Sequence, residues 1–360
     1  MLFSSRQRRR ALDLASKVFA HTPGSRRVAQ LLGRSSSLRC MVFHNIAEKE
    51  SPFTAGIGVN ASPQEFEATL LFVNKYYSPV SLQEILENTN GRKLPSNALL
   101  LTFDDAYASV AEIAAPLCKQ LNIPAVFFVN AAFVDNRRLA PDNLVCYVAD
   151  RFGLEQINAA VRVVFGEKLP VLRSVGEVFG TFFPAISLRE RDSFLGALRE
   201  LTGIDEQKLA AESKLYLTSE QVRSLQSFGF EIGNHTFTHT HSRQLSVEEL
   251  GPEIVRNKTA LGAMSGTQIR AFSQPYGSSK DVTPELARVL RQSGHEAVFL
   301  SESTANPRNL DLFRLDRVNC GTRKAEALFF DLEVMPRLRA VRDQLLQRRA
   351  ILSHQNDHTV

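Results

Sequence analysis

The chain has 360 residues, of which 44% are hydrophobic, and this composition is typical of a globular protein with a sizeable core. No stretch approaches the roughly 18 consecutive apolar residues of a membrane span, so no transmembrane segment is expected. The four cysteines lie far apart without a C-x-x-C pair, which indicates reduced, mostly buried thiols rather than a disulfide framework.

The net charge of +5 comes from an N-terminal tail, since residues 1–40 contain nine Lys or Arg and one acid. Apolar side chains between the basic ones predict a basic helix within residues 1–39. Such a helix can rest on an anionic membrane surface, can belong to an organelle transit peptide, or can simply be solvated. Asp13 and Lys17 interrupt its apolar stretch, so no secretory signal is expected and we predict a cytoplasmic protein, with peripheral membrane contact as an option. Nucleic acid is not an expected partner, because the charge is terminal and lacks interleaved aromatic residues.

After the tail, short apolar runs alternate with helical patterns about seven times. The predicted strands are 40–43, 99–103, 124–129, 230–232, 269–272, 297–300 and 313–318. The predicted helices between them are 63–74, 81–86, 106–121, 220–228, 247–261 and 284–293. This alternation implies an α/β fold with parallel strands joined by crossovers, and the continuous apolar runs indicate strands covered on both faces.

Residues 131–215 break this rhythm, because they show helical patterns at 144–152, 154–165 and 188–201 without a clear strand. We interpret them as a helical insertion between two parts of one barrel. The two parts would be residues 40–130 and 216–321. Residues 322–360 are predicted to form a basic C-terminal helix and tail.

Acidic and histidine side chains follow two of the predicted strands. Asp104 and Asp105 end the first apolar run, and His235 and His239 follow another much later in the chain. One carboxylate and two imidazoles can hold a divalent metal and leave positions open for water and substrate. The second carboxylate remains free to take a proton from that water. Taken alone, Asp-Asp after a strand is more typical of a helix N-cap, and H-x-x-x-H often reflects surface histidines.

Other candidates lie at further strand ends, where barrels of this kind gather their active sites. His44 can contact water or substrate, or be a satisfied buried imidazole. Pro275 and Tyr276 lie in a turn and can form a wall of the substrate groove, although a plain turn is nearly as compatible. Arg317 can pair with Asp104, bind a substrate group or make a structural ion pair. His241 is expected to have a structural role or to support the ligands, and His295, which precedes a strand, is expected to be unrelated to the chemistry.

At these residues the chain resembles the polysaccharide deacetylase family, also called the NodB-homology or carbohydrate esterase family 4 group. Residues 102–105 match its first motif, residues 235–239 match H-[ST]-x-x-H, and residues 272–277 resemble its third motif. The resemblance covers residues 40–320 without the insertion. It implies a distorted (β/α)7-type TIM-like barrel carrying a metal-dependent amide or ester hydrolase.

Residue by residue, the resemblance implies that Asp105, His235 and His239 are metal ligands and that Asp104 is the catalytic base. Two nitrogens and one oxygen suit Zn²⁺ best, with Co²⁺, Ni²⁺ or Fe²⁺ as alternatives. The family usually acts on N-acetylated sugars, so an acetylated glycan is the expected partner. We therefore predict removal of N-acetyl groups from a polysaccharide, oligosaccharide or lipid-linked glycan. The alternatives are a carbohydrate O-acetyl esterase and a non-catalytic glycan-binding protein of the same fold.

Two features depart from the family pattern. The third motif often carries an Arg that orients the base, whereas this chain has Ser273 and Gln274 there, with Arg270 nearby. The family's late Leu-x-His, which provides the general acid, is matched only in letters by residues 352–354 at the end of the chain. The proton donor is therefore not identified by the pattern.

Overall fold

In the computed structural model, residues 18, 22, 38–88, 93–321 and 323–339 are described. The described residues form a sheet of eight strands in which every neighbouring pair is parallel. The order is β10-β1-β5-β6-β7-β8-β9, with β4 beside β5. The strands are β1 (Leu38–Phe43), β4 (Ser78–Pro79), β5 (Ala98–Phe103), β6 (Ala125–Val129), β7 (Glu231–Asn234), β8 (Ala271–Ser273), β9 (Ala297–Phe299) and β10 (Val318–Asn319).

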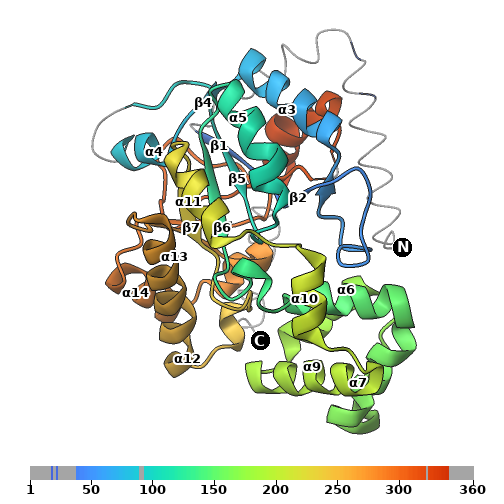
Figure 1. Cartoon of the computed structure of the whole chain (residues 1–360). Coiled ribbons are helices and arrows are strands. Elements are labelled where there is room, and N and C mark those ends of the chain that lie inside the picture. Colours follow the sequence, from blue (N-terminus) through green and yellow to red (C-terminus); the bar gives the residue numbers. More distant parts are fainter. Residues whose placement is uncertain (1–17, 19–21, 23–37, 89–92, 322, 340–360) are drawn as a thin grey trace, which may run out of the picture.

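Helices cover the outer face of this curled sheet (Figure 1). They are α3 (Pro63–Tyr76), α4 (Leu82–Asn88), α5 (Ala115–Gln120), α11 (Ser219–Ser227), α12 (Val247–Gly251), α13 (Asn257–Ser265) and α14 (Pro284–Gln292). A second sheet of two short strands, β2 (Asn45–Ile46) and β3 (Asn60–Ala61), lies after β1. The predicted α/β class and the distorted (β/α)7-type barrel are confirmed.

The long central strands are mostly apolar because they have two buried faces. In β5, Leu99, Leu101 and Phe103 pack in the core beneath the helices. Ala98 and Leu100 alternate with them and pack in the barrel interior. Alternation of side chains across a strand places successive residues on opposite faces, so both sets must be apolar. All four cysteines are free and buried, as predicted.

Residues 131–215 contain helices beside the barrel, in the green to yellow part of Figure 1. They are α6 (Pro141–Phe152), α7 (Leu154–Phe165), α8 (Val175–Glu177), α9 (Leu188–Thr202) and α10 (Glu206–Ser213). This helical insertion has an apolar core of its own, in which Phe182, Phe183 and Phe194 pack together. An isolated antiparallel bridge between Tyr107 and Tyr216, bonded through the backbone of their neighbours, joins it to the chain after β5.

Several predicted element boundaries are wrong, and three of these differences bear on the site or the core. The first strand begins at Leu38, so Arg39 belongs to the sheet, where it is buried and pairs with Glu333 at 2.9 Å. The helix predicted from 106 begins only after Ser109, because the backbone at Asp105 and Ala106 is left-handed. The strand predicted at 313–318 is reduced to β10 and an isolated bridge at residue 315.

The missing part of that last strand has a physical cause in Asp316. Its carboxylate accepts hydrogen bonds from the backbone N–H groups of Glu302 and Thr304, both at 2.7 Å. These bonds replace strand pairing and hold a loop after β9. Carboxylates that accept several backbone bonds stabilise turns in this way.

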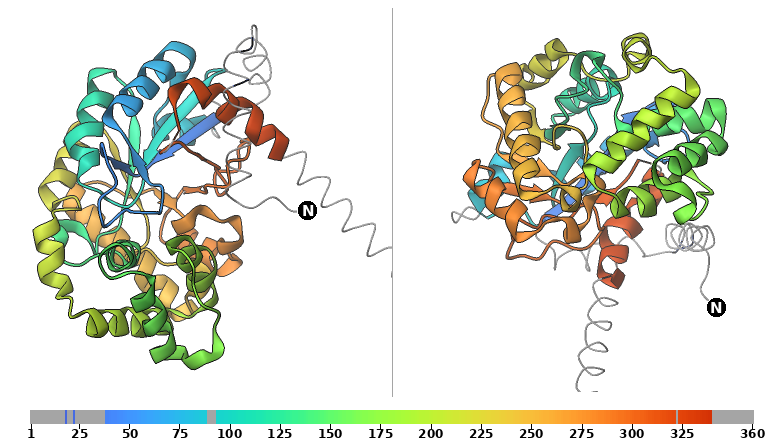
Figure 2. Two further views of the ribbon diagram at one scale, coloured as in Figure 1. Left: turned by 90° about the vertical axis from the view of Figure 1, so that its right-hand side faces the viewer. Right: turned by 90° about the horizontal axis from the view of Figure 1, so that it is seen from below.

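The described part of the C-terminal region, residues 323–339, is largely helical and packs against α3 (Figure 2). Phe329 contacts Phe72 and Tyr76 of α3, with ring centroids 4.8 Å from each. Nearly all of the predicted N-terminal helix, and the sequence from 340 onward including residues 352–354, fall outside the described residues. None of the helices in the described part combines the length and apolar composition needed to cross a bilayer.

Candidate active site

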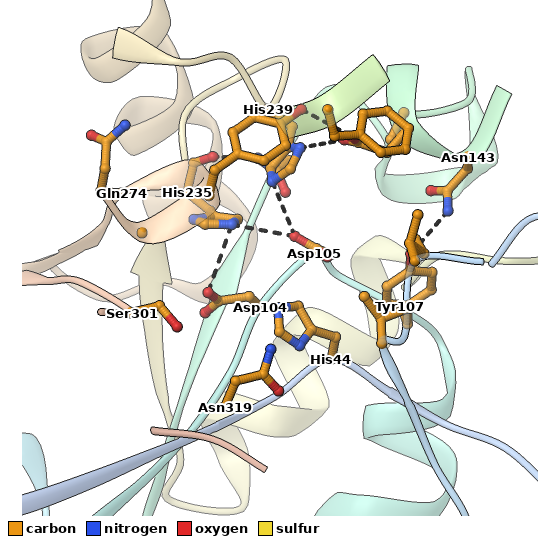
Figure 3. A pocket seen from close by; sticks show the side chains of 18 of the residues that line it. His44, Asp104, Asp105, Tyr107, Asn143, His235, His239, Gln274, Ser301 and Asn319 are labelled. Carbon is orange, nitrogen blue, oxygen red and sulfur yellow. Dashed lines mark hydrogen bonds and ion pairs between the residues drawn. The ribbon is translucent and has the colours of Figure 1, made fainter. Parts of the chain in front are cut away.

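A cavity of about 280 Å³ lies where the carboxyl ends of β1, β5 and β7 meet. The barrel supplies side chains from these strand ends, and the helical insertion and the loop before β3 supply the other walls. Figure 3 shows His44, Asp104 and Asp105 facing His235 and His239 across this cavity. The strand-end residues singled out in the sequence therefore gather in one place, with the exceptions described below.

Both aspartates after β5 face the cavity because the backbone turns sharply there. Asp104 continues the ladder, since its N–H donates to the Phe43 carbonyl at 3.0 Å. Asp105 and Ala106 then adopt φ values of 70° and 59°. Left-handed backbone is unfavourable for residues with a side chain, so the surrounding structure must impose it. The turn lets two adjacent carboxylates share one site.

The histidine loop after β7 is held by buried polar groups. Thr236 and His239 have positive φ, at 61° and 52°. The Glu253 carboxylate accepts the backbone N–H groups of Phe237 and Thr238, at 3.0 and 2.9 Å. The Asn234 side chain accepts the Thr236 N–H at 3.0 Å. Because Asn234 and Glu253 accept the backbone N–H groups of the loop, the loop can hold both imidazoles in a strained but defined position.

The two imidazoles present the same nitrogen to Asp105. His235 Nδ1 lies 2.8 Å from the Ser273 carbonyl, and His239 Nδ1 lies 2.6 Å from Asp142 Oδ2. Both partners only accept, so each Nδ1 carries the hydrogen when the ring is neutral and each Nε2 has a lone pair. The two Nε2 atoms lie 3.3 Å from Asp105 Oδ1, and this oxygen has no hydrogen-bond partner among the described residues.

This arrangement fits a divalent cation. One ligand atom from each of Asp105, His235 and His239 lies within 4.8 Å of the other two. Lone pairs from two neutral imidazoles and a carboxylate would repel one another without a positive charge between them. Nitrogen and oxygen donors in this combination hold metals such as zinc, and the hydrogen bonds at Nδ1 are typical of ligated histidines. Their role as metal ligands stays a prediction.

Without a bound cation, a proton on His239 compensates the negative charges of Asp105 and Asp142. Burial disfavours the ionised forms, but the Asp142 and Asp105 carboxylates raise the pKa of His239 to about 9. The pKa of Asp105 falls well below its usual range, because the effect of burial, which would raise it, is outweighed by the positive charge of His239 and by the neighbouring His235. A cation must therefore displace a proton near neutral pH, so metal binding should weaken as the pH falls.

Asp104 lies beside this group but is held separately. Its oxygens accept hydrogen bonds from Arg317 at 2.8 and 2.7 Å and from the Ser273 hydroxyl at 3.1 Å. Burial raises the pKa of Asp104, but Arg317 outweighs it, so the pKa lies below its ordinary value. Asp104 is thus an ionised carboxylate at neutral pH, 3.8 Å from His235 Nε2.

Arg317 orients Asp104 and has no donor left for a substrate. Besides its two bonds to Asp104, it donates to the Leu300 carbonyl, the Thr102 hydroxyl and the Ser273 hydroxyl. These bonds use all five guanidinium N–H groups, and the residue is 1% exposed. It lines the cavity, but its N–H groups are all used within the protein, and a substrate contact stays a prediction. The alternative of pairing with Asp104 is the one that the geometry shows.

Arg270 does not orient the Asp104 carboxylate. It donates to Gln83 at 2.7 Å and to Glu231 at 3.2 Å, and both contacts lie at the amino end of the sheet. The third motif of this chain therefore supplies Ser273 to Asp104, while the arginine comes from the segment before β10.

His44 follows β1 and lines the cavity next to both aspartates (Figure 3). Its Nδ1 is shielded from solvent and has no hydrogen-bond partner in the described part of the chain. Burial lowers the pKa of His44, although Asp105 and Asp104 oppose this effect. A neutral imidazole with one unused nitrogen therefore lines the site.

Tyr276 lines the cavity, whereas Pro275 does not, and substrate binding by either residue stays a prediction. The Tyr276 ring stacks on His241 with centroids 3.8 Å apart, and its hydroxyl donates to Asp142 at 2.9 Å. His241 in turn bonds Asp281 at 2.9 Å, which fits the structural role expected of it.

Sequence reasoning missed the residues that reach the cavity from the insertion and the preceding loop. They include Asp142, Asn143, Phe179, Ile57 and Val59. No strand-end signal marks them, because they lie on helices or loops. Ser301 and Asn319, by contrast, follow or end β9 and β10, so their position was a usable signal.

Comparisons with known proteins agree on one family. A sequence model described as polysaccharide deacetylase matches residues 91–298, which is more than half of the chain. No curated protein matches the chain.

Solved structures share the fold at low identity. The Streptococcus pyogenes deacetylase PplD, in complex with acetate, gives a TM-score of 0.55 at 15% identity and covers 82% of this chain and 98% of that one. IcaB from Ammonifex degensii gives 0.53 at 19% identity, covering 83% and 98%. A de-N-acetylase from Aggregatibacter actinomycetemcomitans gives 0.52 at 17% identity, covering 80% and 96%.

Proposed function

The chain belongs to the polysaccharide deacetylase family, and from this premise we propose that it is a metal-dependent hydrolase that removes N-acetyl groups from amino sugars of a polysaccharide, oligosaccharide or lipid-linked glycan. The observation that carries this proposal is the convergence of Asp105, His235 and His239 beside a separately held Asp104. A cation and an ionised base next to each other are what hydrolysis of an unactivated amide requires.

Two imidazole nitrogens and one carboxylate suit Zn²⁺ best, with Co²⁺, Ni²⁺ or Fe²⁺ as alternatives. When bound, such a cation supplies a polarised acetyl carbonyl and a water of lowered pKa. Asp104 then accepts the proton of the attacking water. Arg317 and Ser273 keep the Asp104 carboxylate fixed and ionised, so it remains a base rather than a ligand.

The leaving amine of an amide also needs a proton. His44 is neutral before the reaction, so we assign it the relay of this proton: it receives the proton that Asp104 takes from the attacking water and passes it to the amine. His44 lies on the same cavity wall as the two aspartates, and its Nδ1 is not used by any hydrogen bond among the described residues. Residues 352–354 lie outside the described residues and are not needed for this assignment.

The cavity walls favour a single acetylated sugar ring at the site. The cavity volume of about 280 Å³ is at the low end for ligand pockets. On one side the loop before β3 meets the insertion, since Asn143 donates to the Phe53 carbonyl at 2.8 Å and Phe53 stacks on Tyr147 at 5.0 Å. This contact narrows the site from that direction.

Metal removal tests the proposal directly. We expect acetate release from N-acetylated oligosaccharides with the metal-loaded protein, loss of release to background after chelation, and recovery with Zn²⁺. A glycan-binding protein without activity would release no acetate in any state. Release from O-acetylated xylan with none from N-acetylated substrates would identify an esterase instead.

His44→Gln tests the proton donor. We expect kcat for acetamide substrates to fall by roughly 10²-fold, because a positioned general acid contributes about this much. An aryl acetate ester has a leaving group that needs no proton, so its hydrolysis should fall far less. Equal losses on both substrates would point to a structural role for His44 and would contradict the assignment.

A further inference from the structure

We propose that Asp142, on the first turn of α6, is a positioning residue that fixes His239 for metal binding. The inference rests on the proposed metal site and extends it, because it makes the helical insertion part of the catalytic machinery. Asp142 is separated by 97 residues from His239 in sequence, yet its Oδ2 lies 2.6 Å from His239 Nδ1.

The Asp142 carboxylate is used by two residues of the barrel. Oδ2 accepts from His239, and Oδ1 accepts the Tyr276 hydroxyl at 2.9 Å. The side chain is almost fully buried, at 12% exposure, so its charge must be compensated locally. A bond to a carboxylate keeps the hydrogen on Nδ1, turns Nε2 toward Asp105 and makes the imidazole a stronger ligand.

The two histidines differ in what holds them. His235 Nδ1 bonds a backbone carbonyl, that of Ser273, which belongs to the barrel itself. His239 depends instead on a side chain from the insertion. The barrel therefore orients one ligand by itself, whereas the other is correctly oriented only when the insertion is docked.

Buried contacts fix the start of α6 against the barrel. The Asn143 amide donates to the Tyr107 hydroxyl at 2.9 Å and to the Phe53 carbonyl at 2.8 Å. The Tyr216 hydroxyl donates to Asn143 Oδ1 at 2.5 Å. Because the neighbouring residue is held on three sides, the position of the Asp142 carboxylate is determined by packing rather than by a mobile loop.

A second insertion helix braces the same histidine loop. Arg191 of α9 is 1% exposed and donates to the Thr240 hydroxyl at 2.6 Å, next to His239. Contacts from α6 and α9 thus approach the loop from the insertion side, while Glu253 holds it from the barrel side. Because two separate helices of the insertion bond to this loop, a functional connection between the insertion and the metal site is supported.

The experiment compares Zn²⁺ dissociation constants of the full-length wild type, Asp142→Asn and Asp142→Ala by competition with a chromophoric chelator. We expect affinity to fall roughly 10- to 100-fold in both variants, the loss typical of removing a carboxylate partner from a ligated histidine. Asp150→Asn is the matched control, since Asp150 lies on the same helix at the surface and should leave affinity unchanged.

A long-range ¹H–¹⁵N NMR correlation on the Zn²⁺-loaded wild type adds a readout that does not depend on the variants folding. We expect His239 with a hydrogen on Nδ1 and the metal on Nε2, and mixed tautomers in metal-free Asp142→Asn. Wild-type affinity in both Asp142 variants, or a His239 that binds through Nδ1, would overturn the inference. A wild type that binds no divalent metal would instead overturn the proposed function.

Discussion

Asp104→Asn is expected to lower kcat for acetate release by roughly 10²- to 10⁴-fold while the protein still binds its metal, because an amide cannot accept a proton from water. Asparagine has almost the same shape and can still accept a hydrogen bond from Arg317 through its oxygen. The metal ligands Asp105, His235 and His239 are untouched by the change. The predicted signature is therefore loss of turnover without loss of metal.

Three measurements separate this result from damage to the fold. Metal content by elemental analysis should equal that of the wild type, and the KM for the glycan should change far less than kcat. The third is urea unfolding, because Asn leaves the buried Arg317 charge poorly compensated and should cost some stability. Near-normal turnover in a folded, metal-loaded Asp104→Asn protein would remove Asp104 from the role of base.

Asp105→Asn provides the complementary comparison for the same experiment. Its carboxylate lies at the centre of the candidate metal group, with both imidazole nitrogens 3.3 Å from one oxygen. Losing that charge should release the metal as well as the activity. The adjacent aspartates are thereby distinguished by metal content, although either change stops acetate release.

The parallel barrel could be predicted because its signal is local. All β5 residues except Thr102 are apolar, so the run is typical of a strand buried on both faces. The aspartates and histidines were found because they directly follow such runs, and parallel strands bring their carboxyl ends to one edge. What local patterns do not contain is the left-handed turn at Asp105, since neither Asp105 nor Ala106 is a residue that requires it.

Contacts between distant segments could not be predicted from the sequence. The Asp142–His239 bond depends on how the insertion docks, and α6 alone shows an ordinary amphipathic pattern. The role of Arg317 depends on a loop after β9 that Asp316 holds by bonds to backbone N–H groups. Before the fold is known, Arg270 and Arg317 are both reasonable partners for the base, and only the structure separates them.

Arg317→Met is expected to lower the free energy of unfolding of the metal-free protein by about 3–5 kcal/mol, because it leaves the Asp104 carboxylate buried without its partner. Arg270→Met is the matched control. Arg270 is also bonded to a carboxylate, but that pair is more exposed, at 23% and 28%, and should be worth about 1 kcal/mol or less. Urea unfolding of both variants measures the difference, and equal losses would refute the special role of Arg317.

The pH dependence of Arg317→Met follows from the same pair. In the wild type, Arg317 lowers the folded-state pKa of Asp104, so its contribution to stability is present above the unfolded pKa and is lost as the pH falls through the folded value. Without Arg317, burial dominates and raises that pKa, so stability is lost as the pH rises through it. The difference in free energy of unfolding between variant and wild type should therefore be wide at pH 7 and narrow on acidification.

For the same reason, the acid limb of the kcat profile should move to higher pH in the metal-loaded variant, since a larger share of Asp104 is protonated and cannot act as a base. A difference in free energy of unfolding that does not depend on pH would mean that Arg317 acts through packing alone.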